Sequence, residues 1–188
     1  GMLNTGVNNG LYVQYGCGLS CPEDWINFDS SPTLRIQRNF LLNLLLNKHL
    51  NVVFPKKVRY GDIVKGLNIK DNSCDGIYCS HILEHLSYVD LLKSIKNTYN
   101  MLKFGGVFRM VVPDMEYYCR EYLSSIEKED PDACIRLMQD TLLGKKERKK
   151  SISQLIQSYF GNSEHLWMWD YLSIRNELLK AGFKEIRR

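Results

Sequence analysis

The first residues whose types and spacing could do chemistry are two glycines and an aspartate near the start of the chain. Gly16 and Gly18 follow the apolar stretch Leu11 to Tyr15, and Asp29 ends a shorter one, Trp25 to Phe28. This pattern predicts two strands joined by a glycine turn. Glycine lets a ligand approach the main chain closely, and a carboxylate at the end of a strand can receive ribose hydroxyls. On its own, the stretch fits a nucleoside site and an ordinary glycine turn equally well.

The spacing within this stretch argues against a dinucleotide. A dinucleotide motif needs a third glycine, a helix that opens onto the pyrophosphate, and an acidic residue about twenty positions later. Here Cys21 occupies the third glycine position, Pro22 follows, and Asp29 comes too early for a full helix. A cofactor without phosphates, such as S-adenosylmethionine, needs only the close backbone approach and the ribose partner. A nicotinamide dehydrogenase is therefore disfavoured.

A second group of reactive residues follows a later predicted strand. Ser80 and His81 come directly after the stretch Cys74 to Cys79, and Glu84 and His85 follow closely. If this segment opens a helix, the two histidines share a face because they are four residues apart. A histidine can be a general base, but a capping or packing histidine is the alternative. For Glu84, a helix-start carboxylate favoured by the dipole is preferred over an acid or base.

Two further candidates lie later in the chain. Asp114 follows the apolar stretch Val107 to Val112, and its alternative role is a proline–aspartate turn. His165 belongs to an aromatic group with Trp167 and Trp169, which either packs within a lid or forms a wall of an acceptor pocket. Other residues that would extend such a wall are Met115, Tyr117, Tyr118 and Tyr122.

Composition places the chain among ordinary globular proteins. Its 188 residues suit one domain, with 44% hydrophobic and 24% charged residues. No apolar run approaches the roughly 18 residues that indicate a membrane span. The six cysteines show no paired metal-ligand spacing, so we expect reduced thiols, no metal site and a cytoplasmic protein. The net charge of +4 is mild, and the basic run Lys145 to Lys150 is typical of a solvated helix end or loop, which disfavours a nucleic-acid partner.

Strand-length apolar runs alternate with helical patterns along most of the chain. Strands are expected over 11–15, 25–28, 58–60, 74–79, 107–112 and 183–186. Helices are expected over 33–48, 88–102 and 170–181, the second stopped by a glycine cap at Lys103 to Gly106. This alternation predicts an α/β fold with a doubly wound, mostly parallel sheet. We expect a single domain, 1–188, in which residues 115–165 form a helical lid on the acceptor side.

Taken in order, these motifs resemble the class I, Rossmann-like S-adenosylmethionine-dependent methyltransferases. The match is to the small branch with a short loop between the first two strands. The segments that carry it are Gly16-Cys17-Gly18, Trp25 to Asp29, Gly61-Asp62-Ile63, Asp75 to His85, Leu102 to Gly106 and Leu179 to Phe183. The chain departs from the family because it lacks the helix after the first strand. It also stops near the sixth strand, where family members add a seventh, antiparallel one.

The resemblance implies an enzyme that binds S-adenosylmethionine and transfers its methyl group. It assigns cofactor binding to Tyr15, Gly16, Cys17, Gly18, Asp29, Ser30, Gly61, Asp62, Ile63, Ser80 and His81. Within that set, Asp29 would bind the ribose and Asp62 the adenine amino group. The catalytic candidates are His81, His85, Asp114 and His165, although a base is needed only when the acceptor must lose a proton.

The methyl acceptor is the part that this resemblance does not determine. A small molecule, a lipid or a glycan is favoured, and neither the oligomeric state nor the acceptor atom is predicted. The main alternative is a non-catalytic S-adenosylmethionine-binding module that regulates a partner. Such a module would keep the cofactor residues but lack a working acceptor pocket.

Overall fold

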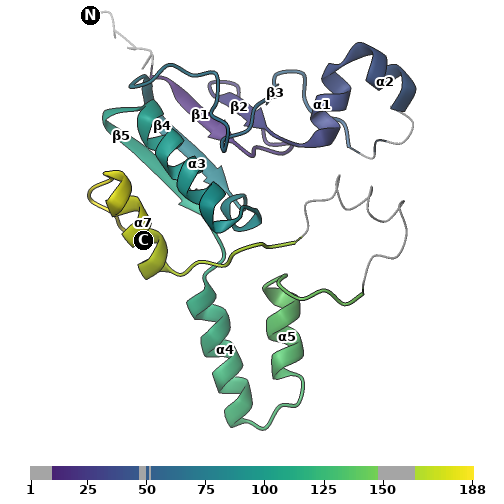
Figure 1. Ribbon diagram of the computed structural model, residues 1–188, viewed down its shortest axis with the longest axis vertical. Helices are drawn as coiled ribbons and strands as arrows, with labels where there is room; N and C mark the ends of the chain where they lie inside the picture. The colour runs from purple at the N-terminus through teal and green to yellow at the C-terminus, as the bar shows by residue number, and fades with distance from the viewer. Residues whose placement is uncertain (1–9, 47–49, 51, 148–163) are drawn as a thin grey trace, which may run out of the picture.

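The chain is built around a parallel sheet. The computed structural model describes residues 10–46, 50, 52–147 and 164–188. The sheet has five strands in the order β3-β2-β1-β4-β5, and all its pairs are parallel (Figure 1). The strands are β1 Tyr12–Tyr15, β2 Ile26–Asp29, β3 Arg59–Tyr60, β4 Cys74–Ser80 and β5 Leu102–Val111. The predicted doubly wound α/β sheet is confirmed, and its strand order reverses between β1 and β4, where ligands of such folds bind.

The two central strands form the middle of the core. Val13 of β1 pairs in register with Ile26 of β2 and with Ile77 of β4. Val13 and Ile77 are 0% and 1% exposed, as expected for strands covered on both faces. The start of β1 is fixed by Asp75, whose carboxylate accepts a hydrogen bond of 2.7 Å from the Leu11 amide.

The connection between β1 and β2 contains no helix in residues 16–25, all of which are described. Parallel strands usually need a helical crossover, so this short loop requires its own support. The side-chain amide of Asn27 provides it by donating to the carbonyls of Pro22 (3.0 Å) and Trp25 (2.9 Å) and to the Cys21 sulfur (3.4 Å). The predicted short loop is therefore confirmed.

The single helix expected over 33–48 is instead two short helices, α1 Pro32–Arg38 and α2 Phe40–Leu46. The break lies at Asn39, whose backbone is extended and whose side-chain oxygen accepts a hydrogen bond from the Leu42 amide. Asn39 thus begins a new helix, as asparagine commonly does. The expected buried stripe ends with α1, because no residue of α2 is buried. Lys48 lies outside the described residues.

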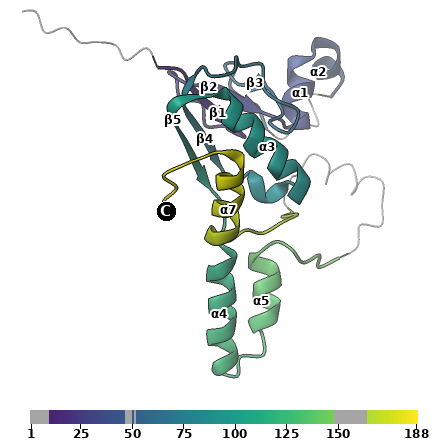
Figure 2. The same cartoon turned by 60° about the vertical axis from the view of Figure 1, so that its left-hand side comes forward.

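Helices α3 Tyr88–Met101 and α7 Tyr171–Ala181 lie side by side against the sheet (Figures 1 and 2). Leu91 and Ile95 of α3 and Ile174 and Leu178 of α7 belong to the same buried cluster as the central strands. The expected helix over 170–181 is confirmed, with Asp170 as its N-terminal cap and Gly182 in the left-handed conformation after it.

The expected glycine cap after α3 is wrong. The helix ends at Met101, and Leu102 already pairs with Cys74 of β4. Gly105 and Gly106 lie instead within an irregular part of β5, where the pairing shifts between Leu102 and Val107. A side chain at Gly106 would lie 2.9 Å from the Cys74 carbonyl oxygen, so the glycine permits this close strand approach.

The expected sixth strand over 183–186 is not formed, and β5 is an edge of the described sheet. Phe183 closes the end of α7 by donating its amide to the Leu178 carbonyl. Its ring packs against those of Tyr99 and Phe108, and its backbone does not pair with β5. One face of β5 is consequently open, with Val107 64% exposed, although the stretch Val107 to Val112 is mostly apolar.

Two helices extend beyond β5. They are α4 Met115–Glu127 and α5 Ala133–Asp140, and both views show them side by side, projecting away from the carboxyl ends of β4 and β5 (Figures 1 and 2). The helical character expected for this segment is confirmed where it is described. A lid that covers the strand ends stays a prediction. No helix within the described residues is both long and apolar enough to cross a bilayer.

The Asp170 cap gives a stability prediction with a defined pH dependence. Its carboxylate accepts a hydrogen bond from the Ser173 amide (2.7 Å), and this bond lowers the pKa of Asp170 in the folded protein. We expect Asp170→Ala to lose about 1 kcal/mol of unfolding free energy at pH 7. Because the folded pKa is below the unfolded one, the contribution is complete above about pH 4 and is lost as the pH falls through the folded pKa.

Urea unfolding of the wild type and the variant between pH 7 and pH 3 measures this effect. Asp170→Asn is the matched control, because it keeps a capping oxygen that does not titrate. Equal stability of the wild type and Asp170→Ala at pH 7 would contradict the role of this cap.

Candidate functional site

The glycine turn after β1 has two glycines with different surroundings. Gly16 has φ +62° and packs against the segment after β4, because a side-chain carbon added there would lie 2.2 Å from Cγ1 of Ile82. Gly18 has φ +56°, and no atom lies within 4 Å of the position that its side-chain carbon would take. Gly16 therefore joins the loops after β1 and β4, whereas Gly18 faces open space that a ligand can occupy.

Asp29 closes this turn from the end of β2. One carboxylate oxygen accepts a hydrogen bond from the Gly18 amide (2.9 Å), and the other accepts one from the Ser31 amide (2.8 Å). The residue is 8% exposed. A carboxylate oxygen has two lone pairs, so each oxygen of Asp29 can accept one more hydrogen bond. Ser30, which follows it, is exposed.

The loop after β3 continues the same edge. The Gly61 amide donates to the Asp29 carbonyl (3.0 Å), and a side chain at Gly61 would lie 2.6 Å from the ring of Phe28. Asp62 accepts a hydrogen bond from the Val64 amide (3.0 Å), and its other oxygen lies 3.9 Å from the Lys65 ammonium. Its side chain is 27% exposed, which leaves it accessible to a ligand.

Three of the predicted cofactor residues turn their side chains into the core. Tyr15 is 2% exposed, and its hydroxyl forms a hydrogen bond with that of Thr98. Ile63 is 5% exposed. Cys17 is also 5% exposed, and its burial raises the pKa of the thiol to about 12. Cofactor binding by these residues stays a prediction, and their burial favours a role for their main-chain groups. All six cysteines are described and none forms a disulfide, as expected.

The segment after β4 is a short 3-10 helix, Leu83–His85, rather than the start of a longer helix. His81 precedes it with φ +54°, a conformation that is uncommon for residues other than glycine and often marks functional sites. Its amide donates to the Val111 carbonyl of β5 (2.9 Å), and its side chain is 63% exposed. His81 thus projects from the end of the sheet beside Ser80.

Backbone hydrogen bonds bring a distant segment to this 3-10 helix. The Leu166 amide donates to the Glu84 carbonyl (2.8 Å), and the His165 amide donates to the Leu142 carbonyl (3.3 Å). Trp169 pairs with Asp114 at the start of α4. These contacts place His165 beside Glu84 and His85 although about eighty residues separate them in sequence.

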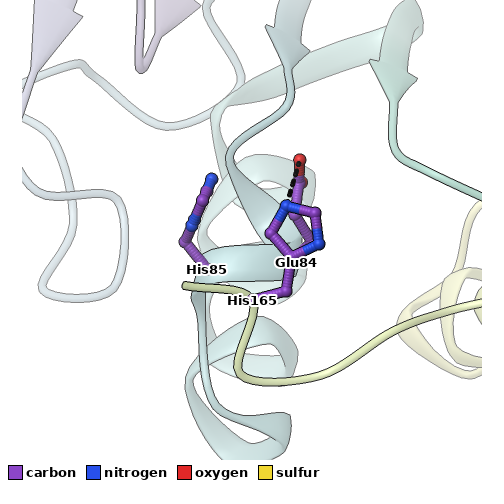
Figure 3. A group of neighbouring side chains, drawn as sticks. All are labelled: Glu84, His85 and His165. Atoms are coloured by element: carbon purple, nitrogen blue, oxygen red, sulfur yellow. Dashed lines mark ion pairs between the residues drawn. The ribbon is translucent and has the colours of Figure 1, made fainter. Parts of the chain in front are cut away.

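Glu84 faces His165 in this group, with the His85 ring beside them (Figure 3). Its side chain is 1% exposed, and one carboxylate oxygen lies 3.4 Å from Nδ1 of His81 and 3.9 Å from Nε2 of His165. The rings of His85 and His165 meet edge to face at 4.9 Å. Burial lowers the pKa of His165, although the nearby Glu84 carboxylate opposes that shift, so the ring is mainly neutral at pH 7.

The central position of Glu84 was not foreseen. The sequence placed it between two histidines, but it was interpreted as a helix-start carboxylate, which would be solvated. The burial of Glu84 depends on His165 and the residues around it. No local sequence pattern links that segment to the 3-10 helix. The candidate histidines His81, His85 and His165 are brought together around it.

Asp114 stands apart from this group. Its carboxylate accepts a hydrogen bond from the Glu116 amide (3.0 Å) and pairs with Arg188 (3.4 Å). Among the described residues, no contact joins it to the histidines. These contacts are those of a helix cap, so a catalytic role for Asp114 stays a prediction.

The aromatic residues near His165 divide into two kinds. Trp169 is 2% exposed and belongs to the core, whereas Trp167 is 47% exposed and packs on Tyr88 with ring centroids 5.2 Å apart. Tyr117 on α4 is 60% exposed. Trp167 and Tyr117 are therefore accessible from solvent, and Trp169 is not.

The two glycines of the turn allow a matched test of the packing at Gly16. We expect Gly16→Ala to be less stable than Gly18→Ala by about 1–3 kcal/mol. In both variants the alanine is strained at a positive φ that favours glycine, but only the alanine at position 16 must also displace Ile82. Urea unfolding of the two variants measures the difference. Equal losses would show that the loops after β1 and β4 do not pack together at this point.

Comparisons with known proteins were made with the whole chain. A family model described as a methyltransferase domain matches residues 5–110, which is more than half of the chain. A search of curated proteins found no match. A solved S-adenosylmethionine-dependent methyltransferase from Archaeoglobus fulgidus is 18% identical with a TM-score of 0.51, and the alignment covers 95% of this chain and 62% of that one.

A second solved structure comes from Thermotoga maritima and is described as a possible histamine N-methyltransferase. It is 19% identical with a TM-score of 0.49, and the alignment covers 94% of this chain and 65% of that one. The chain thus spans less than two thirds of the length of either structure. The family match over most of the sheet, together with the strand order, shows that this chain belongs to the methyltransferase domain family and has the fold of the class I S-adenosylmethionine-dependent methyltransferases.

Proposed function

We propose that this chain binds S-adenosylmethionine at the carboxyl ends of β1, β2 and β3 and transfers its methyl group to an acceptor beside β4 and β5. The observation that carries the proposal is the Asp29 carboxylate. It is held by the Gly18 amide at 2.9 Å, next to the open space at that glycine, and keeps lone pairs for two further hydrogen bonds. Two adjacent ribose hydroxyls are donors of the right number and spacing for it.

The rest of the cofactor site follows along the same edge. Asp62 would receive the adenine amino group, because its carboxylate is accessible and lies one residue beyond the Gly61 contact with Asp29. The methionine end would reach Ser80 and His81 across the point where the strand order reverses. Tyr15, Cys17 and Ile63 would contribute main-chain groups, and Ser30 would lie at the rim.

Methyl transfer needs little covalent chemistry from the protein. The S–CH₃ bond of the sulfonium breaks as the acceptor–CH₃ bond forms, and S-adenosylhomocysteine leaves, so positioning supplies much of the rate. When the acceptor carries a proton, His81 is placed to remove it, because its ring is exposed and Nδ1 faces the buried Glu84 carboxylate at 3.4 Å. His85 and His165 would then shape the acceptor side.

A small molecule, a lipid or a glycan is the acceptor class we favour. The exposed rings of Trp167 and Tyr117 offer apolar, stackable surfaces, and Trp169 connects Trp167 to the start of α4. In this proposal residues 1–188 form one domain, and the segment 115–165 is a helical lid on the acceptor side.

The alternative is a non-catalytic module that binds S-adenosylmethionine and regulates a partner. Methyl transfer from labelled S-adenosylmethionine to a panel of small molecules, lipids and glycans distinguishes the two. The enzyme transfers label to at least one class, whereas the module binds the cofactor and transfers none.

The cofactor assignment is tested by calorimetry with S-adenosylhomocysteine. We expect the wild type to bind it and Asp29→Asn to bind it about 5- to 150-fold more weakly, which corresponds to roughly 1–3 kcal/mol for a buried hydrogen-bonding group that loses its partner. The exposed Asp24, on the same loop, provides the matched control Asp24→Asn, whose affinity should equal that of the wild type.

Two results would overturn this assignment. Unchanged affinity in a folded Asp29→Asn variant would place the ribose elsewhere. Binding of NAD without binding of S-adenosylhomocysteine would mean that the site takes a dinucleotide. Thermal unfolding of each variant verifies that the mutated loop is intact.

A further inference from the structure

Three metal-ligand side chains converge beside the 3-10 helix after β4. Glu84 and His85 belong to that helix and His165 to the segment hydrogen-bonded against it, and one potential ligand atom of each lies within 4.8 Å of the others (Figure 3). Two imidazoles and one carboxylate are a frequent donor set for transition metals. We propose that Glu84, His85 and His165 bind a divalent transition-metal ion.

The Glu84 carboxylate is the strongest indication of a missing partner. Its side chain is 1% exposed, and neither of its oxygens accepts a hydrogen bond in the described part of the chain. The histidine ring nitrogens nearest to this carboxylate are Nδ1 of His81 and Nε2 of His165, at 3.4 and 3.9 Å. Buried carboxylates are normally hydrogen-bonded, paired or bound to a metal, because an uncompensated buried charge is costly. A cation among these side chains would supply the compensation.

The His85 ring is already oriented as a ligand. Its Nδ1 lies 2.8 Å from the Glu164 carbonyl oxygen. A carbonyl can only accept, so Nδ1 carries the proton and Nε2 of the neutral ring carries the free lone pair. Metal-binding histidines commonly donate their second ring N–H to a carbonyl or carboxylate in this way. The contact therefore fixes both the tautomer and the ring orientation that a metal requires.

The donor set also restricts the ion. Calcium and magnesium prefer oxygen ligands, whereas imidazoles suit zinc, iron and similar metals. Three protein ligands leave at least one position open, as in catalytic rather than structural zinc sites. Zn²⁺ is the most suitable probe, because such sites generally bind it more tightly than Mn²⁺ or Fe²⁺.

A bound ion would connect two parts of the chain that are distant in sequence. It would join the 3-10 helix after β4 to the segment containing His165 and add to the Leu166–Glu84 backbone hydrogen bond. This inference does not rest on methyl transfer. Zn²⁺ and S-adenosylhomocysteine use different residues, so either can bind when the other does not.

Titration of the untagged, metal-free full chain with Zn²⁺ tests the site. We expect one equivalent to bind and to raise the melting temperature. Glu84→Gln, His85→Ala and His165→Ala should each weaken binding by more than the roughly 10- to 100-fold that loss of an outer-shell partner costs. Glu23→Gln is the matched control and should keep wild-type affinity, because Glu23 is exposed. His81→Ala removes a neighbour of the Glu84 carboxylate rather than a ligand, so it should weaken binding by no more than about 10- to 100-fold.

A Co²⁺ titration checks that the six thiols are not the ligands. The absorption spectrum should lack thiolate-to-cobalt charge transfer. The proposal is overturned if no equivalent of Zn²⁺ binds, if the cobalt spectrum shows thiolate ligands, or if the three ligand variants bind Zn²⁺ like the wild type. Circular dichroism identifies any variant that does not fold, and the remaining ligand variants then decide the outcome.

Discussion

The loops at the carboxyl ends of β1, β2 and β3 depend on one carboxylate. Asp29 joins the glycine turn after β1 to the start of α1 through the amides of Gly18 and Ser31, and its own carbonyl receives the Gly61 amide. Three loops are thus fixed by a single residue at the end of β2. The loop between β1 and β2 has no helix to support it, so this carboxylate and the Asn27 amide take over that role. The same geometry that holds the loops presents the remaining lone pairs of Asp29 to a ligand.

A second carboxylate organises the opposite side. Glu84 is buried beneath the exposed His81, and its backbone carbonyl receives the segment that carries His165. Gly16 links the two halves, because its bare α-carbon packs against Ile82 just before the 3-10 helix. The loops after β1 and β4 therefore meet at the reversal of the strand order, between the proposed cofactor and acceptor sides.

The strands and the glycine turn between β1 and β2 could be predicted because their signals are local. Apolar runs define β1, β2 and β4, and Gly18 and Asp29 lie at fixed short distances from them. The errors have both local and tertiary causes. Asn39 divides the helical apolar pattern into two helices through a local contact, the cap that its side chain forms on the Leu42 amide. Gly105 and Gly106 serve an irregular strand pairing rather than a helix end.

The buried state of Glu84 could not be predicted because its cause is also tertiary. It depends on His165, whose position is set by hydrogen bonds to residues far away in sequence. The loss of the expected strand over 183–186 follows from the ring of Phe183, which packs into the core instead of leaving its backbone free to pair with β5. Both features result from contacts that form only in the assembled fold.

The central claim is that the edge formed by Gly18, Asp29 and Asp62 holds the nucleoside of S-adenosylmethionine. The most direct measurement is a crystal structure of the chain with S-adenosylhomocysteine bound. The account predicts both ribose hydroxyls within hydrogen-bonding distance of the Asp29 carboxylate and the adenine amino group at Asp62. A nucleoside bound away from Asp29, or one whose ribose contacts neither of its oxygens, would contradict it.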